Sequence, residues 1–171
     1  MNINPIFQQH LRFTYAHFSH KKSIIHGLPH WQNVWHNAIY LSEKESIDPL
    51  VPQLFAISHD FQRLNDSIDP QHGPRAARLL KQNKLLQEML TPQQHKDLLY
   101  ACQTHTGGNR APNLVVGVCW DSDRLDITRV GKMLDVQYLT TETAKDIAVS
   151  FAAEDEWLAY RRELPSIYNL L

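Results

Sequence analysis

The sequence predicts an all-α fold, a single-domain bundle of about six to eight helices. Apolar residues recur at spacings of three and four through most of the 171-residue chain, and this is the period of a helix face. Proline follows a capping residue at several places, as it does in the first turn of helices. Residues 114–120 have the composition of a buried strand. Because the chain has no other strand candidate, we expect them to form a helix too.

The first predicted helix spans residues 4–20, and a connector follows over residues 21–29, where a glycine and a proline interrupt any helix. The second helix begins near His30. Its apolar face, on which His30 also lies, is made by Val34, Ala38 and Leu41. We therefore expect His30 at the first turn of a helix, with its side chain facing the core.

The third predicted helix starts after Asp48, with Asp48 as the N-cap and Pro49 at the first position. It is apolar on most sides, so we expect it to be central and buried. The helix ends in the adjacent pair His59 and Asp60, which continue its inward-facing rows. Residues 61–70 are polar and rich in turn formers, which predicts a loop that leaves this pair.

The remaining helices are predicted from caps and apolar stripes. Asp69 caps the fourth, ahead of Pro70, and residues 91–94 form the capping box of the fifth. The predicted spans are residues 70–84, 91–105, 114–125, 140–153 and 154–164, the last being an eighth helix or a continuation of the seventh. Residues 106–112 form a loop between the fifth and the sixth.

Composition narrows the class of protein. The formal net charge of -1 at pH 7 gives no support for a nucleic-acid partner or an anionic membrane surface. The N-terminus lacks the pattern of a signal peptide, and no apolar run is long enough to span a membrane. Cys102 and Cys119 show no disulfide framework. We expect a cytoplasmic protein whose oligomeric state stays open, with a homodimer among the options.

The chain contains ten histidines, and about half of them have an ordinary explanation as surface residues. These are His10, His17, His20, His36 and His95. His26 lies in the connector before the second helix, where it is either a surface residue or a group that lines a site. The other histidines need individual treatment.

A set of four residues suggests a metal site. They are His30, His59, Asp60 and Asp123. Each lies near the end of a predicted buried helix and faces the core, and a divalent cation offsets the cost of burying such carboxylates. Alternatively, Asp60 caps a helix, Asp123 pairs with a nearby arginine, and the histidines are hydrogen-bonded core residues. For the four residues as a set, we favour metal binding over these structural roles.

The order of these residues resembles the HD superfamily of metal-dependent phosphohydrolases, which is named for its adjacent His-Asp pair. Three segments carry the resemblance: His-Trp-Gln-Asn-Val from His30, Ser-His-Asp ending at Asp60, and Trp-Asp-Ser-Asp-Arg-Leu-Asp ending at Asp126. It covers about residues 27–131, and further helices follow over residues 140–164. The resemblance implies an HD-like fold in one domain over residues 1–171, with metal bound by His30, His59, Asp60 and Asp123.

The resemblance also assigns residues whose role periodicity leaves open. It places the last ligand at Asp123, so Asp121 is a reserve ligand and more simply an acceptor that orients a histidine or arginine. Family members with two metals have two further histidines, and His72 and His105 fit their order. These histidines would hold a second ion bridged by Asp60, or they would bind substrate phosphate directly.

The candidate substrate-binding residues are Arg63, Arg75, Arg124 and His26, because a guanidinium matches two phosphate oxygens. At Arg63 the sequence also departs from the family pattern. HD nucleotidases acting on deoxynucleoside monophosphates often have a glutamate three residues after the His-Asp pair, and Arg63 stands there in this chain. That specific activity is therefore in doubt.

The function expected from the sequence is hydrolysis of a phosphoester or phosphoanhydride bond in a nucleotide or other small phosphate compound by a metal-activated water. The candidate catalytic residues are Asp60, Arg63, His72 and His105. The nitrogen and oxygen ligands suit one or two ions of Mn, Fe, Co, Ni or Zn, and Mg is compatible. The alternatives are a di-iron oxygenase of HD type and a non-catalytic nucleotide-binding or regulatory HD module.

Overall fold

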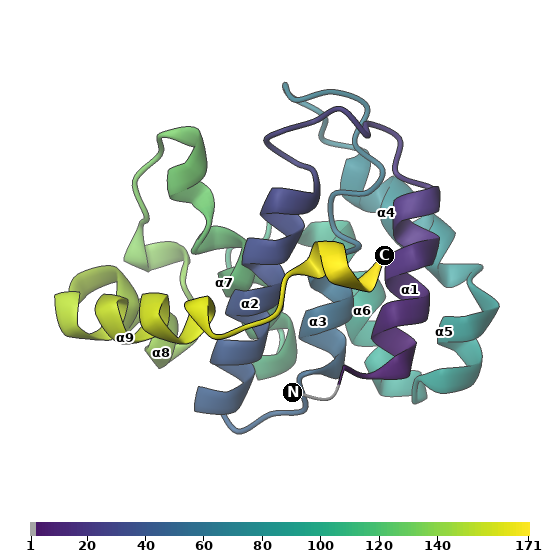
Figure 1. Ribbon diagram of the computed structural model, residues 1–171. Helices are drawn as coiled ribbons and strands as arrows, with labels where there is room; N and C mark the ends of the chain where they lie inside the picture. Colours follow the sequence, from purple (N-terminus) through teal and green to yellow (C-terminus); the bar gives the residue numbers. More distant parts are fainter. Residues whose placement is uncertain (1–2) are drawn as a thin grey trace.

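Every regular element in the computed structural model, which describes residues 3–171, is a helix (Figure 1). The α-helices are α1 (Pro5–Ala16), α2 (Leu28–Lys44), α3 (Leu50–Ala56), α4 (His72–Lys81), α5 (Lys84–Met89), α6 (Pro92–Thr104), α7 (Leu114–Arg124), α8 (Glu142–Val149) and α9 (Phe151–Arg162). Short 3-10 helices are η1 (Ile127–Val130), η2 (Val136–Tyr138) and η3 (Ile167–Leu170). The all-α prediction is confirmed for these residues.

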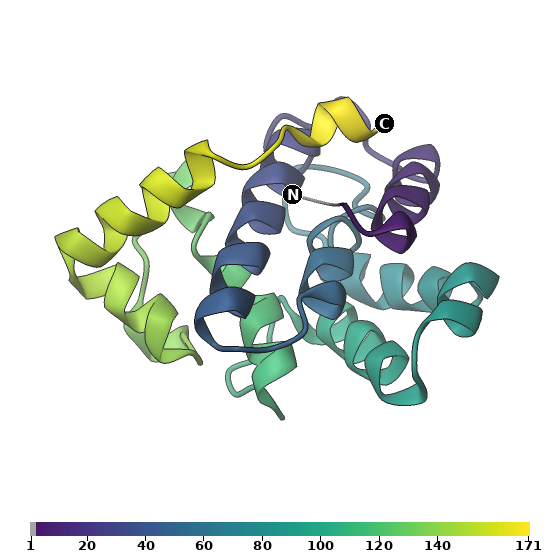
Figure 2. The ribbon, with the colours of Figure 1, turned by 60° about the horizontal axis from the view of Figure 1, so that its bottom comes forward.

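Helix α3 lies at the centre of the fold, against α1, α2, α6 and α7 (Figure 2). All of its residues from Val51 to Ala56 are buried, as its apolar sequence predicts. Aromatic side chains from the surrounding helices complete this core, among them Phe7, Trp31, Trp35 and Trp120. Full burial of one such side chain contributes about 1.5–3 kcal/mol to folding, so the turn after α3 follows directly from a well-packed hydrophobic core.

Helices α8 and α9 pack on the side of the molecule opposite α1, α4 and α5 (Figures 1 and 2). They share a second hydrophobic cluster with α2 and α7 that includes Tyr40, Val118, Ile147 and Trp157. The predicted end of the helix over residues 140–153 is wrong, because α8 stops at Val149 and α9 begins after Ser150. This residue adopts an extended conformation, and its side chain caps α9 by accepting the Ala153 N–H.

Helix boundaries near the His-Asp pair also differ from prediction. Helix α3 ends at Ala56, so His59 and Asp60 lie in the turn that follows rather than in the helix. Helix α4 begins at His72 instead of Pro70, because the Asp69 carboxylate accepts hydrogen bonds from the Leu64 N–H and from an arginine instead of capping α4. Within the described part of the chain, no helix is both long and apolar enough to cross a bilayer.

Candidate metal centre

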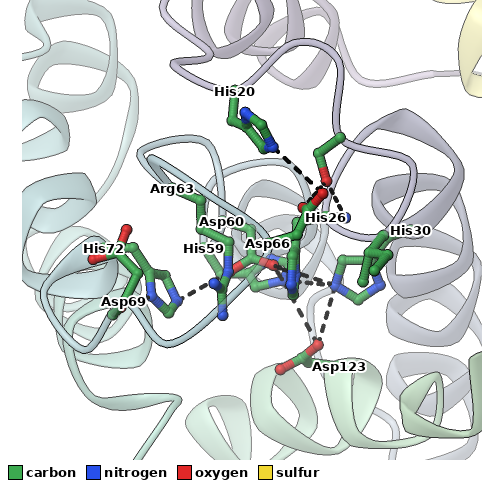
Figure 3. Close-up of polar contacts among 12 residues, drawn as sticks. His20, His26, His30, His59, Asp60, Arg63, Asp66, Asp69, His72 and Asp123 are labelled. Atoms are coloured by element: carbon green, nitrogen blue, oxygen red, sulfur yellow. Dashed lines mark hydrogen bonds and ion pairs between the residues drawn. The ribbon is translucent and has the colours of Figure 1, made fainter. Parts of the chain in front are cut away.

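Four buried imidazoles meet where α2, α4, α6 and the turn after α3 converge. Three of them, His30, His59 and His72, are labelled in Figure 3. His30 comes from the first turn of α2, His59 from the turn after α3, His72 from the start of α4 and His105 from the end of α6. Their Nε2 atoms form two close pairs. The Nε2 atoms of His30 and His59 are 3.0 Å apart, and those of His72 and His105 are 2.8 Å apart.

The opposite nitrogen of each ring faces an acceptor. Nδ1 of His30 faces the Asp126 carboxylate. Nδ1 of each other histidine faces a backbone carbonyl oxygen: that of Ala56 for His59, that of Asp69 for His72, and that of Cys102 for His105. A proton on Nδ1 satisfies each acceptor, and each Nε2 then presents a lone pair. Two lone pairs at such short range repel each other unless a cation lies near both. The donor set therefore fits divalent metal ions.

Asp60 lies between His30 and His72 (Figure 3), and its two oxygens face the two imidazole pairs. Its Oδ2 atom is 3.7 Å from Nε2 of His30 and 3.5 Å from Nε2 of His59. Its Oδ1 atom is 3.0 Å from Nε2 of His72 and 3.6 Å from Nε2 of His105. One carboxylate thus offers a separate oxygen to each pair, the arrangement in which an aspartate bridges two metals.

Asp123 completes the first pair. Its Oδ1 atom is 3.2 Å from Nε2 of His30 and 3.6 Å from Nε2 of His59. We define the first position by His30, His59, Asp60 Oδ2 and Asp123, and the second position by His72, His105 and Asp60 Oδ1.

The reserve candidate Asp121 does not reach either position. Its buried carboxylate accepts hydrogen bonds from the N–H groups of Thr140 and Thr141 and from the Thr141 hydroxyl. Nη1 of Arg124 lies 4.0 Å from it. Asp121 therefore holds the start of α8 against α7, because Thr141 is the N-cap of that helix.

Burial and neighbouring charges shift the pKa values of these groups in different directions. Burial lowers the pKa of His59 to about 3, so this imidazole is neutral near pH 7. Burial alone raises the pKa of Asp60, but the neighbouring imidazoles, His59 foremost, outweigh it and hold that pKa well below the usual range. At His30, hydrogen bonds to Asp123 and Asp126 outweigh burial and raise the pKa. Carboxylates that favour an imidazolium there also favour a metal cation in its place.

A cavity of about 510 Å³ opens above the cluster. Asp60, His72, His105 and Asp123 contribute to its lining, so both positions reach it. Its basic residues are Arg63, Arg124, Arg129 and Lys132. An adjoining hollow of about 790 Å³ shares these four residues and adds apolar ones, namely Ile25, Ile68, Pro70 and Val130. Candidate ligands of both positions thus line a basic cavity with an apolar flank.

The predicted substrate-binding residues have different locations. Arg63, Arg124 and His26 line the cavity, whereas Arg75 does not. The Arg75 guanidinium instead donates to the Gln62 carbonyl at 2.9 Å and to the Asp69 carboxylate. The prediction for Arg75 therefore needs correction: its charge is used to fold the loop before α4.

Three residues of the site were not predicted from the sequence. Asp126 accepts from Nδ1 of His30 at 2.8 Å, and its spacing of three residues from Asp123 near the end of α7 was the available signal. Arg129 and Lys132 line the cavity from the region after α7. That region contains only short 3-10 helices, so its sequence carries no period that could have indicated their direction.

Two histidines interpreted as surface residues are buried. His10 is fully buried, its Nε2 lies 2.8 Å from the Ser58 hydroxyl, and burial lowers its pKa to about 3. His36 is buried with its Nε2 2.9 Å from the Pro165 carbonyl. The surface interpretation is wrong for these two, while His17 is exposed as expected.

Comparison with known proteins supports the fold. No family model matches the sequence, and no curated protein matches it. A solved structure of a predicted HD superfamily hydrolase from an uncultured Thermotogales bacterium matches with a TM-score of 0.67 and 23% sequence identity. The match covers 91% of this chain and 92% of that chain. The HD-like fold expected from the sequence is thereby confirmed.

Proposed function

We propose that this protein is a metal-dependent hydrolase that cleaves a phosphoester or phosphoanhydride bond in a small phosphate compound. One observation carries the proposal: four imidazole Nε2 atoms converge on the two oxygens of Asp60 at the floor of a basic cavity. Metal ligands at the floor suit activation of water, and the basic walls suit a phosphate group.

Two divalent ions fit the residues, one in each position. The ligands of the first would be His30, His59, Asp60 and Asp123, and those of the second would be His72, His105 and Asp60. Nitrogen and oxygen donors without thiolate suit Mn, Fe, Co, Ni or Zn, and Mg is compatible. When bound, such ions supply Lewis acidity toward a phosphoryl oxygen and lower the pKa of coordinated water.

The basic side chains of the cavity would bind and orient the phosphate. Arg63 directs Nε to Asp60 at 3.2 Å and Nη1 to the Ser67 carbonyl at 3.1 Å, and its Nη2 has no partner among residues 3–171. Lys132 is exposed at the cavity wall. Together these cations would stabilise the negative charge that develops on the phosphoryl oxygens as the bond breaks.

His26 would contribute to proton transfer. Its Nδ1 lies 2.8 Å from Oδ2 of Asp60, and its ring lines the cavity without belonging to either metal position. An imidazole in this place would hold the carboxylate in orientation and exchange a proton with the leaving group. The apolar flank at Ile25 and Ile68 would accept an organic group, such as that of a nucleotide.

The experiment combines elemental analysis of protein purified without chelators with a phosphate-release panel of mononucleotides and simple phosphate esters under several divalent metals. We expect bound transition metal and release that His59→Ala and Asp60→Ala abolish. Asp135→Asn, at the cavity wall outside both positions, is the control and should retain metal and activity. Absence of bound metal together with unchanged activity in the two variants would contradict the proposal.

The same preparations separate the alternatives. A di-iron oxygenase would show visible absorbance from iron and oxygen uptake instead of phosphate release. A non-catalytic module would bind nucleotide but release no phosphate with any metal.

A further inference from the structure

Helix α9 reaches the metal centre through two asparagines of α2, Asn33 and Asn37, which lie one helical turn apart. Each side-chain amide accepts a hydrogen bond from α9 with its oxygen and donates one with its nitrogen to the segment at the end of α7. That segment, residues 122–126, contains Asp123. The C-terminal helix is thus linked twice to the part of the chain that contributes the last ligand of the first position.

The first link ends on a proposed metal ligand. Nη2 of Arg161 donates to Oδ1 of Asn33 at 2.6 Å, and Nδ2 of Asn33 donates to Oδ1 of Asp126 at 2.9 Å. The other oxygen of Asp126 lies 2.8 Å from Nδ1 of His30. A continuous chain of hydrogen bonds therefore runs from the half-buried Arg161 to His30.

The second link has the same form. Nε1 of Trp157 donates to Oδ1 of Asn37 at 3.0 Å, and Nδ2 of Asn37 donates to the Ser122 carbonyl at 2.8 Å. The Arg161 guanidinium lies over the Trp157 ring, 4.9 Å from its centroid, so the two links support each other. Because the oxygen of each amide accepts from α9 and its nitrogen donates to the segment 122–126, each asparagine amide has one defined orientation.

We propose that Asn33 and Arg161 are positioning residues of the first metal position, an inference that rests on the proposed function. Asn33 holds the Asp126 carboxylate toward His30, which fixes the proton on Nδ1 and directs the Nε2 lone pair to the metal. Without Asn33, Asp126 is free to rotate toward Arg129, whose Nε already lies 3.6 Å from Oδ2. His30 then loses both its orientation and part of its basicity.

The test is metal affinity in a chelator competition titration with Zn²⁺, together with the visible spectrum of the Co²⁺-loaded protein. We expect Asn33→Ala and Arg161→Met to lower the affinity for the ion at the first position, by about tenfold for Asn33→Ala and by less for Arg161→Met. Both variants should change the Co²⁺ spectrum. Arg161→Lys keeps a donor for Asn33 and should recover part of the affinity.

Two neighbours serve as matched controls. Gln32 also lies on α2 and holds the C-terminal segment, because its side-chain oxygen accepts from the Ser166 hydroxyl and the Ile167 N–H. Its amide does not contact Asp126, so Gln32→Ala should lower the melting temperature of the metal-free protein but leave Zn²⁺ affinity unchanged. Arg162→Met removes an exposed charge next to Arg161 and should change neither quantity.

A Zn²⁺ affinity of Asn33→Ala equal to that of Gln32→Ala, with both melting temperatures lowered, would show a structural role only and overturn this inference while leaving the proposed function intact. No metal binding by the wild-type protein would overturn both. If Asn33→Ala does not fold, Arg161→Met provides the test, because Arg161 is the half-buried residue at the other end of the hydrogen-bond chain. An unchanged Zn²⁺ affinity and an unchanged Co²⁺ spectrum in Arg161→Met would overturn the inference.

Discussion

The two proposed metal positions share Asp60 but differ in their other ligands and in the groups that contact those ligands. The first has two imidazoles and two carboxylates, and Nδ1 of His30 faces the carboxylate of Asp126. The second has two imidazoles and one oxygen of Asp60, and its histidines face carbonyl oxygens. Nε of Arg63 lies 3.2 Å from that same oxygen. A site with a larger number of anionic ligands binds a cation more tightly. We therefore expect high affinity for the ion at the first position and lower affinity, with faster exchange, for the ion at the second.

The largest difference should appear when one histidine is removed from each position. His59→Ala should abolish metal binding at the first position and reduce phosphate release by about a thousandfold or more, equivalent to about 4 kcal/mol of transition-state stabilisation. His72→Ala should retain the first ion, lose the second and reduce release by about a hundredfold. Elemental analysis and kinetics measure both. Equal loss of both ions in the two variants would contradict the expected difference in affinity between the two positions.

Arg63 should have opposite effects on the second ion and on substrate. Arg63→Gln removes the cation that shares Oδ1 of Asp60, so the second ion should bind more tightly. The same change removes a charged phosphate contact, so KM should rise by about tenfold, the loss of about 1.4 kcal/mol. Metal titration and steady-state kinetics of one preparation check both signs. Weaker binding of the second ion would mean that Arg63 supports this position instead of competing with it.

Asp121 and Asp123 should separate stability from metal affinity. Asp121→Ala leaves the part-buried N–H of Thr140 and the buried N–H of Thr141 without this acceptor. It should lower the free energy of unfolding by about 1–3 kcal/mol and leave metal affinity unchanged. Asp123→Ala should weaken the first ion. Chemical denaturation with and without metal measures the two effects, and a loss of metal affinity in Asp121→Ala would return that residue to the ligand set.

A smaller effect is expected from His10, which lies behind Ser58 in the turn that contains the His-Asp pair. Its pKa is about 3 in the folded protein against 6.5 for an exposed imidazole. The unfolded chain therefore binds the extra proton below pH 6.5, and stability falls as pH falls from 6.5 toward 3. At one pH unit below 6.5, this histidine alone lowers the free energy of unfolding by about 1.4 kcal/mol.

His10→Gln should reduce the pH dependence of stability in the metal-free protein by that amount, measured by denaturant unfolding between neutral and mildly acidic pH. His17→Gln changes an exposed histidine next to the same helix and serves as the control. An unchanged pH dependence in His10→Gln would mean that His10 becomes protonated without unfolding.

The sequence indicated the residues of the proposed first position more directly than those of the second position or of the cavity. The inward direction of His30 follows from the helical period of α2. His59 and Asp60 lie in the turn after α3, so they were indicated by the buried apolar run before them and by the family resemblance. The regions around the cavity have no such period, and Arg129 and Lys132 were missed there. Arg75 was misjudged because its partner Asp69 was interpreted as a helix cap. Contacts between distant segments, such as Asn33 with Asp126, depend on how α2 packs against α7 and leave no local signal.

The central claim is that the four histidines and Asp60 bind divalent metal in two unequal positions. It is tested most directly by titrating the metal-free protein with Zn²⁺ against a chromophoric chelator, for the wild type and for Asp60→Ala. We predict two ions per chain with clearly different affinities in the wild type, and loss of the second ion with strong weakening of the first in Asp60→Ala. No bound ion in the wild type, or two ions bound with unchanged affinity in Asp60→Ala, would contradict the account.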